Sequence, residues 1–197
     1  TFSHEIRNPL ALITSEMQML SDSQPQLCFN EHWDNIMENL NYIRELLDEL
    51  SRYQNAGHIS LVQTDLSICR ITSSFRPELD YLGISFETDI PRDLPQISLD
   101  QTKIRQALFN LLRNAQESIQ HTHGKILFSA SAVPDGVQIT ISDNGCGMTE
   151  DQIENAFRPF VTYKPGGTGL GLAVTRQIIE AHHGTLRVES VPGEGTI

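Results

Sequence analysis

The sequence has 197 residues, and its 25 acidic and 14 basic side chains give a formal net charge of −11 at pH 7. This acidic balance, without a cluster of Lys or Arg, argues against a nucleic-acid-binding protein, although a local loop can still bind a phosphorylated ligand. The three cysteines, Cys28, Cys69 and Cys146, lack metal-binding spacing and favour structural thiols in a reducing compartment.

No signal peptide is visible, and no apolar run approaches the roughly 18 residues needed to span a bilayer. The chain begins without Met and inside a helical pattern. We therefore expect a piece of a longer protein, in which a membrane segment could lie upstream.

The first predicted element is an amphipathic helix that contains SHEIRNPLALI. At about 100° per residue its apolar side chains share one narrow face; they are Ile6, Leu10, Ile13, Met17 and Leu20. His4 and Asn8 lie one turn apart on the opposite face, with Glu5 on the flank. A solvated helix face is the simpler interpretation of these three polar residues taken alone.

A second amphipathic helix is predicted over residues 31–54, after a turn-rich connection in which Pro25 disfavours helix at the preceding residue. Two such helices joined by a short loop form an antiparallel hairpin. Because one hairpin cannot bury both apolar stripes, we predict a homodimer in which two hairpins form a four-helix bundle.

The pattern changes near Ala56, where a second part of the chain is predicted to begin. Its expected elements are a strand at 61–64, a helix at 66–79, a strand at 84–89, a long helix at 100–120, a β-hairpin around PDG, a short helix at 149–156, a helix at 169–183 and a strand at 185–189. A mixed sheet with helices on one face makes this part an α/β sandwich, and the whole chain is of the α+β class.

Two polar patterns in this second part could bind a ligand. Asn110 and Asn114 lie four residues apart on the long helix, and an Asn carbonyl is a suitable ligand for Mg²⁺. Asp143 follows a strand in DNGCG, where its carboxylate could accept a hydrogen bond from an amino-purine and Gly145 and Gly147 would let the ring approach. Surface asparagines and an ordinary Asp-Asn-Gly turn are the simpler interpretations of these residues taken alone.

The most specific stretch is FRPFVTYKPGGTGLGLAV. Lys164 supplies a cation, and four glycines crowd into the start of a helix, where exposed backbone N–H groups form an anion site. The segment is neither a P-loop nor a dinucleotide fingerprint, because Lys164 precedes the glycines and no strand leads directly into them. A flexible glycine-rich connector is the alternative interpretation.

Five motifs, in this order, resemble those of the sensor histidine kinases of two-component systems. They are the phosphoacceptor box at 4–9, the asparagine box at 110–114, the first glycine box at 143–147, the phenylalanine box at 157–160 and the second glycine box at 167–171. The resemblance covers nearly the whole chain and is greatest to the nitrogen-regulation and sporulation-kinase branches.

The resemblance implies a dimerisation and histidine phosphotransfer hairpin over residues 1–55 and a Bergerat-type ATP-binding domain over residues 56–197. His4 would attack the γ-phosphate of ATP with Glu5 as general base, and the phosphoryl group would pass to an aspartate of a cognate response regulator. Asn8, with Glu5, would orient a water for dephosphorylation of the regulator. This would be the cytoplasmic part of a protein at a bacterial cell membrane.

The resemblance also implies the ligand contacts. Asn114 would bind Mg²⁺ with support from Asn110, and Asp143 would bind the adenine amino group. Lys164 and the second glycine box would hold the phosphates; that box contains Gly167, Thr168, Gly169, Leu170 and Gly171.

Two departures from the family pattern stand out. Glu117 takes a place where many relatives carry a basic residue, which leaves more of the phosphate neutralisation to Lys164 and Mg²⁺. Tyr163 replaces the second Thr of the common TTK sequence.

Two other functions remain as alternatives. An ATPase of the gyrase, chaperone or mismatch-repair group would need a Glu in place of Asn110 and would leave His4 unexplained. A non-catalytic dimeric scaffold would not need intact His4, Asn114 and Asp143, and nucleotide binding would distinguish it.

Overall fold

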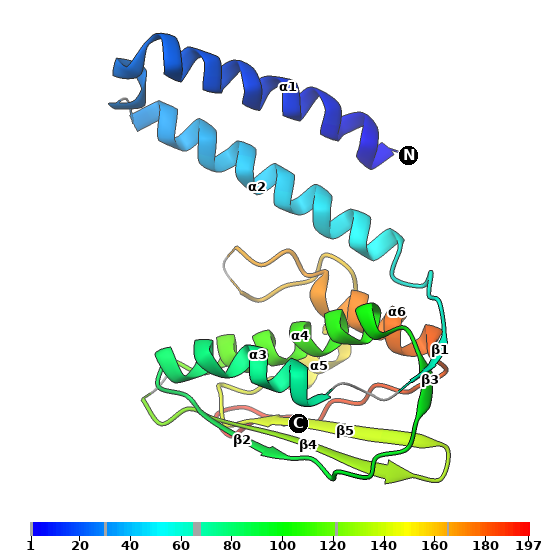
Figure 1. Ribbon diagram of the computed structural model, residues 1–197. Helices are drawn as coiled ribbons and strands as arrows, with labels where there is room; N and C mark the ends of the chain where they lie inside the picture. Colours follow the sequence, from blue (N-terminus) through cyan, green and yellow to red (C-terminus); the bar gives the residue numbers. More distant parts are fainter. Residues whose placement is uncertain (1, 30, 65–67, 121, 165) are drawn as a thin grey trace. The chain divides into compact units, whose positions relative to one another are not determined.

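The computed structural model describes residues 2–29, 31–64, 68–120, 122–164 and 166–197 (Figure 1). The chain divides into two compact units, residues 1–55 (unit 1) and residues 56–197 (unit 2). Within the described ranges, none of the helices combines the length and the apolar character needed to cross a membrane.

Unit 1 is a hairpin of two long helices, α1 (Phe2–Ser23) and α2 (Glu31–Gln54). The antiparallel arrangement in Figure 1 confirms the predicted hairpin. The short 3₁₀ helix η1 (Pro25–Phe29) joins the two helices, where the sequence predicted a turn. Proline suits the first position of such a helix, because its missing N–H would have no partner within the helix there.

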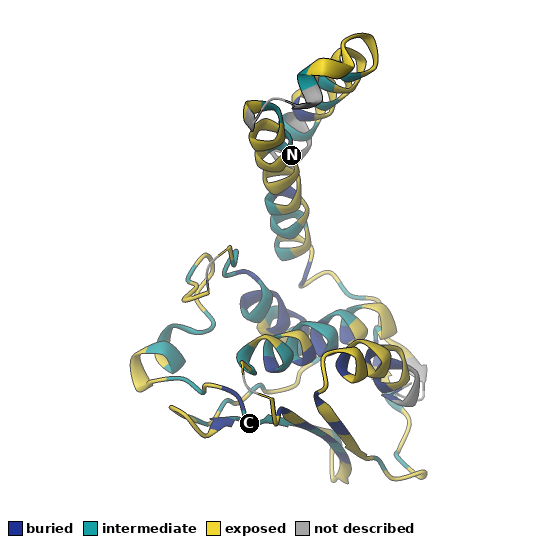
Figure 2. Ribbon diagram, turned by 90° about the vertical axis from the view of Figure 1, so that its left-hand side faces the viewer, coloured by how far each residue is buried: buried dark blue, intermediate teal, exposed yellow. Residues whose placement is uncertain are grey.

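Most of the apolar surface of the hairpin is open to solvent in the single chain. Among its described residues, the buried apolar side chains are Leu10 and Leu47. Four members of the predicted apolar stripes are 40% to 46% exposed: Ile13, Leu20, Ile36 and Ile43. Figure 2 shows exposed residues, in yellow, along both helices. One hairpin therefore leaves much of its apolar stripe unburied.

The sheet of unit 2 has five strands in the order β2-β4-β5-β7-β6. It consists of β2 (Ser85–Asp89), β4 (Lys125–Val133), β5 (Gly136–Asp143), β6 (Ser190–Val191) and β7 (Gly195–Thr196). The β2–β4 pair is parallel and the other pairs are antiparallel, so the predicted mixed sheet is confirmed. A separate antiparallel pair joins β1 (Val62–Thr64) to β3 (Ile97–Leu99), a strand that the sequence analysis did not predict.

Helices cover one side of this sheet, as predicted (Figure 1). They are α3 (Ile68–Tyr81), α4 (Gln101–Ser118) and α6 (Gly171–Ala181), with the short α5 (Glu150–Asn155) between β5 and α6 in the chain. Residues 66 and 67, where the first of these helices was predicted to begin, lie outside the described residues. The sheet and its helix layer together form the two-layer sandwich expected from the sequence.

The core of unit 2 lies where the helix layer meets the sheet (Figure 2). Alternate residues of β4 are buried, with Phe128 completely inaccessible, and so is an apolar face of α4 that repeats every three or four residues. Asp100 caps α4, because its Oδ1 accepts the Lys103 N–H at 3.1 Å. Since the apolar face of α4 is fixed in the core, residues 110, 113, 114 and 117 lie on the remaining surface of the helix.

The strand predicted at residues 185–189 is wrong. These residues form no regular strand, and only Glu189 exchanges backbone hydrogen bonds with Ile197, at 2.9 and 2.7 Å. The strands instead form at β6 and β7, on either side of a turn at residues 192–194. Gly193, in the turn, and Gly195, at the start of β7, adopt φ values of 82° and 121°. Leu186 and Val188 are half-buried, so their alternation reflects one-sided burial. Alternation alone does not supply a neighbouring strand to complete the hydrogen bonds.

Candidate functional site

Asn110 links α4 to the beginning of α6. Its Nδ2 donates to the Gly171 carbonyl at 3.2 Å and to Thr175 Oγ1 at 3.4 Å, and Thr175 is completely buried. The amide group of Asn110 therefore holds the second glycine box against the asparagine box. The spacing of the two motifs in the sequence did not indicate this contact.

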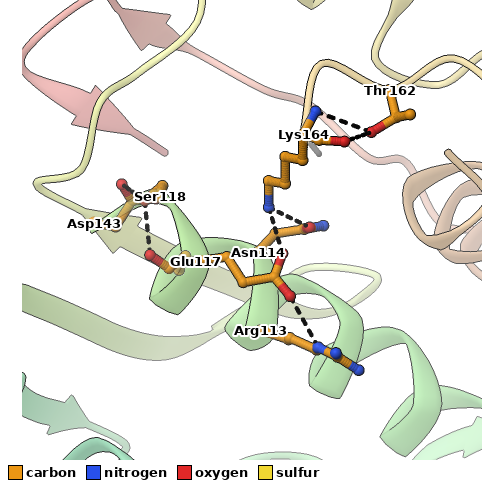
Figure 3. Close-up of polar contacts among 8 residues, drawn as sticks. Arg113, Asn114, Glu117, Ser118, Asp143, Thr162 and Lys164 are labelled. Atoms are coloured by element: carbon orange, nitrogen blue, oxygen red, sulfur yellow. Dashed lines mark hydrogen bonds and ion pairs between the residues drawn. The ribbon is translucent and has the colours of Figure 1, made fainter. Parts of the chain in front are cut away.

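Asn114, one turn further along α4, contacts the loop that precedes α6. Lys164 Nζ donates to Asn114 Oδ1 at 3.2 Å and to Glu117 Oε2 at 2.7 Å (Figure 3). Glu117 Oε1 in turn accepts from Arg113 Nε at 2.9 Å. Asn114 and Lys164 were predicted separately from the sequence, and the ammonium group of Lys164 joins them in the structure.

Glu117 remains ionised in this arrangement. Burial by itself would raise the pKa of its carboxyl group, but the hydrogen bonds and positive charges of Lys164 and Arg113 outweigh burial and lower this pKa. Position 117 therefore places a carboxylate beside Asn114, with Lys164 Nζ between them.

Asp143 lies at the end of β5, where the chain leaves the sheet. Its Oδ1 accepts hydrogen bonds from Ser118 Oγ at 2.9 Å and from the Gly145 N–H at 2.8 Å (Figure 3). Burial of the carboxyl group raises its pKa, and these hydrogen bonds offset part of that effect. The result is a fixed, half-buried hydrogen-bond acceptor. Ser118, which holds Asp143 from α4, was not identified from the sequence.

The glycines of the first glycine box are required by packing within the protein. A Cβ atom on Gly145 would collide with Ser118 Oγ, and one on Gly147 would collide with the Val191 carbonyl. Gly147 also has a φ of 65°, which other residues rarely adopt. These glycines let the loop lie against α4 and β6, and the close approach of a ligand expected from the sequence stays a prediction.

The second glycine box closes the loop that carries Lys164. The Phe160 N–H donates to the Gly169 carbonyl at 3.1 Å, and a Cβ on Gly169 would come within 2.6 Å of the Phe160 carbonyl carbon. Within the loop, the Gly167 N–H donates to the Lys164 carbonyl at 3.1 Å. These contacts bring the phenylalanine box and the second glycine box together at the base of the loop.

The start of α6 is anchored in the core while its backbone donors stay available. Leu170 is buried, and its N–H donates to Thr168 Oγ1 at 3.4 Å. Leu170 is also the N-cap residue of α6 and has no side-chain capping hydrogen bond. Gly171 then begins the helix, so the first N–H groups of α6 can meet an anionic ligand.

The predicted phosphoacceptor residues belong to unit 1 and stand apart from this cluster in the chain. His4, Glu5 and Asn8 are in the first three turns of α1. Asn8 is exposed, as the helical indexing predicts, whereas the side chains of His4 and Glu5 lie outside the described part of the structure. The two groups of predicted site residues therefore belong to separate units.

The fold and the site of unit 2 are those of a nucleotide-binding domain. Comparison with known proteins supports this class. Residues 99–197 match the family model of the histidine kinase-, DNA gyrase B- and HSP90-like ATPases. Residues 1–58 match the His Kinase A (phospho-acceptor) domain. The chain therefore belongs to the sensor histidine kinases of two-component systems.

Individual relatives agree with this assignment. Sporulation kinase B of Bacillus subtilis (strain 168) is 33% identical over 206 residues, which cover 98% of this chain and 46% of that protein. Full-length ShkA in complex with AMPPNP matches 100% of this chain and 43% of its own, with a TM-score of 0.80 and 25% identity. Histidine kinase ThkA in complex with the response regulator protein TrrA shares the fold, with a TM-score of 0.67, 24% identity and coverage of 99% of this chain and 57% of its own. The chain spans about half the length of the curated relative.

Proposed function

We propose that this chain binds ATP in unit 2, transfers the γ-phosphoryl group to His4 in unit 1, and passes it to an aspartate of a response regulator. The main support for the proposal is a cluster of groups beside the C-terminal half of α4. The cluster consists of Asp143, Asn114, Lys164 and the start of α6, which has no side-chain cap. The match of residues 1–58 to a phospho-acceptor domain supplies the acceptor side of the reaction.

In the proposed nucleotide complex, each group of the cluster has a separate partner. The Asp143 carboxylate accepts a hydrogen bond from the adenine amino group. Lys164 and the backbone of residues 167–171 hold the phosphates, because a helix N-terminus favours negative charge. Asn114 supplies an oxygen ligand for Mg²⁺, which when bound neutralises charge on the phosphates.

In the proposed autophosphorylation, an imidazole nitrogen of His4 attacks the γ-phosphorus. The bond from phosphorus to the β–γ bridging oxygen breaks, and ADP leaves with that electron pair. Glu5 accepts the proton from the other imidazole nitrogen. In the second step the regulator's aspartate attacks phosphorus and the P–N bond breaks, which regenerates His4. Asn8, with Glu5, orients the water for dephosphorylation of the regulator.

We also propose that two chains associate through unit 1. The exposed apolar side chains of α1 and α2 support this, because a second hairpin would bury them in a four-helix bundle. The response regulator would then bind at the exposed face that carries Asn8.

The proposal is tested by labelling the chain with ATP that carries a labelled γ-phosphate, in the presence of Mg²⁺. We expect an acid-labile, alkali-stable label on the wild type and none on His4→Gln, which should still bind ADP. Label retained by His4→Gln would contradict the assignment of His4. A wild-type chain that neither becomes labelled nor binds ADP would favour the non-catalytic scaffold.

A labelled chain would also exclude a gyrase-type ATPase, in which water and not histidine accepts the phosphoryl group. Asn110 argues against that alternative as well. Its amide donates to the Gly171 carbonyl, and an amide cannot act as the base that activates water.

A further inference from the structure

The ammonium group of Lys164 occupies a position that two oxygen atoms of α4 share. Asn114 Oδ1 and Glu117 Oε2 lie 3.2 Å and 2.7 Å from Lys164 Nζ. The two side chains are three residues apart, so they project from the same face of the helix. Figure 3 shows both oxygens directed at the lysine from below, while the loop brings Lys164 from above. The oxygens of Asn114 and Glu117 thus form a small cation-binding site, which the ammonium group of Lys164 occupies.

Glu117 also has a partner other than Lys164. Arg113 Nε contacts the other carboxylate oxygen, Oε1, at 2.9 Å from one turn earlier in α4. If Lys164 leaves, Glu117 keeps this exposed partner on its own helix. Oε2 then lies beside Asn114 Oδ1 as an oxygen ligand without its ammonium partner.

Lys164 can leave this position easily. Its side chain is 44% exposed and that of Glu117 is 36% exposed, and ion pairs between groups of this exposure contribute little to stability. Lys164 also belongs to the loop between the phenylalanine box and the second glycine box. The phosphates of a bound nucleotide would offer its ammonium group a partner of higher charge than one carboxylate.

We propose that Glu117, together with Asn114, is a ligand of the divalent cation that accompanies the nucleotide, and that Lys164 holds the cation position until nucleotide binds. This inference rests on the proposed function, which assigns only Asn114 to the cation. Hard divalent cations favour carboxylate and carbonyl oxygens, and affinity rises with the number of charged ligands. A carboxylate beside a neutral Asn carbonyl fits that preference.

The test measures Mn²⁺ binding to the full 197-residue chain by the electron paramagnetic resonance signal of free Mn²⁺, with and without ADP. Mn²⁺ accepts the same oxygen ligands as Mg²⁺. We expect Glu117→Gln to weaken Mn²⁺ binding to the ADP complex about tenfold or more. Lys164→Met should tighten the binding of Mn²⁺ alone, because it removes the competing ammonium, and should weaken ADP binding.

Glu180→Gln is the matched control. Glu180 forms the same kind of i, i+4 pair with Arg176, at 2.7 Å, on the exposed side of α6. This variant removes one negative charge and one helix ion pair but no proposed ligand. We expect its Mn²⁺ affinity to equal that of the wild type.

Three results would overturn the inference. The first is a Glu117→Gln chain that binds Mn²⁺ within about twofold of the wild type, and the second is equal weakening by Glu180→Gln. The third is that Glu117→Gln no longer weakens Mn²⁺ binding in about 1 M KCl. At this ionic strength the Debye length is about 3 Å, so salt screens a long-range charge effect but does not replace a direct ligand.

ADP binding in EDTA separates this inference from the proposed function. A wild-type chain that binds ADP, with Mn²⁺ binding insensitive to Glu117→Gln, contradicts the inference alone. A wild-type chain that binds no ADP under any condition contradicts the proposed function and this inference with it.

Discussion

The two units of this chain differ in how completely they bury their apolar residues. Unit 2 encloses side chains from three helices and a five-stranded sheet, among them Phe128, Leu112 and Ile178, which are completely inaccessible. Unit 1 buries Leu10 and Leu47 among its described residues and leaves much of its stripe exposed. Unit 2 therefore has a core of its own, whereas we expect unit 1 to need a second surface against its helices.

The largest effect is expected from Phe128→Ala, in the centre of the unit 2 core. Loss of a fully buried aromatic side chain should reduce the free energy of unfolding by about 3–5 kcal/mol. Calorimetry should show a lower transition for unit 2 and an unchanged one for unit 1. Val133→Ala, at the exposed end of the same strand, is the control and should change little. A common shift of both transitions would contradict the expectation that the two units unfold independently.

The next effect concerns unit 1. Ile43→Glu places a charge in the predicted interface, and an unpaired buried charge costs about 3 kcal/mol or more, equivalent to over a hundredfold in dimer dissociation. Light scattering should show the molar mass fall from two chains to one. Asn41→Glu adds the same charge on the exposed side of α2 and should leave the dimer intact. If both variants dissociate equally, the apolar stripe is not the interface.

Within unit 2, Asp143→Asn should separate stability from ligand binding. Loss of a charged acceptor should weaken ADP binding by about 1.5–3 kcal/mol, or about 10- to 100-fold, measured by titration calorimetry. Thermal stability should rise slightly near pH 7, because the folded protein disfavours the ionised form of this carboxyl group.

The pH dependence follows from the sign of the shift. The pKa of Asp143 is raised above its ordinary value of 3.8. The contribution of this group to stability is therefore complete below that value and is lost as the pH rises through the raised pKa. The stabilising effect of Asp143→Asn should accordingly disappear on acidification. A variant less stable than the wild type near pH 7 would show that hydrogen bonding outweighs burial at this site.

The smallest effects come from one local contact in each unit. Asp100→Ala removes the cap of α4 and should reduce the stability of unit 2 by about 1 kcal/mol. Arg7→Ala removes contacts to Asp48 and Ser51 in unit 1. The ion pair joins partly exposed groups, so the loss should be less than about 1 kcal/mol. Denaturant unfolding measures both. A larger loss for Arg7→Ala than for Asp100→Ala would mean that unit 1 depends on this pair more than its exposure indicates.

Features that depend on residues close together in the sequence were predicted correctly more often than features that depend on distant partners. The hairpin helices and α4 were predicted because their apolar residues repeat every three or four positions over several turns. The strand at 185–189 was wrong and β3 was missed, because short strands depend on partners that are distant in the sequence. Glu117 was noted as a departure, but its contact with Lys164 joins residues 47 positions apart.

The sequence by itself determined the α+β class, the amphipathic hairpin and the order of the motifs, because these depend on residue types at short, fixed spacings. The tertiary structure alone decided which motif residues meet: Asn110 with Gly171, Ser118 with Asp143, and Lys164 with Asn114 and Glu117. The physical reason is that a hydrogen bond or ion pair between separate elements depends on how their apolar faces pack. That packing brings α4, β5 and the start of α6 together around the site.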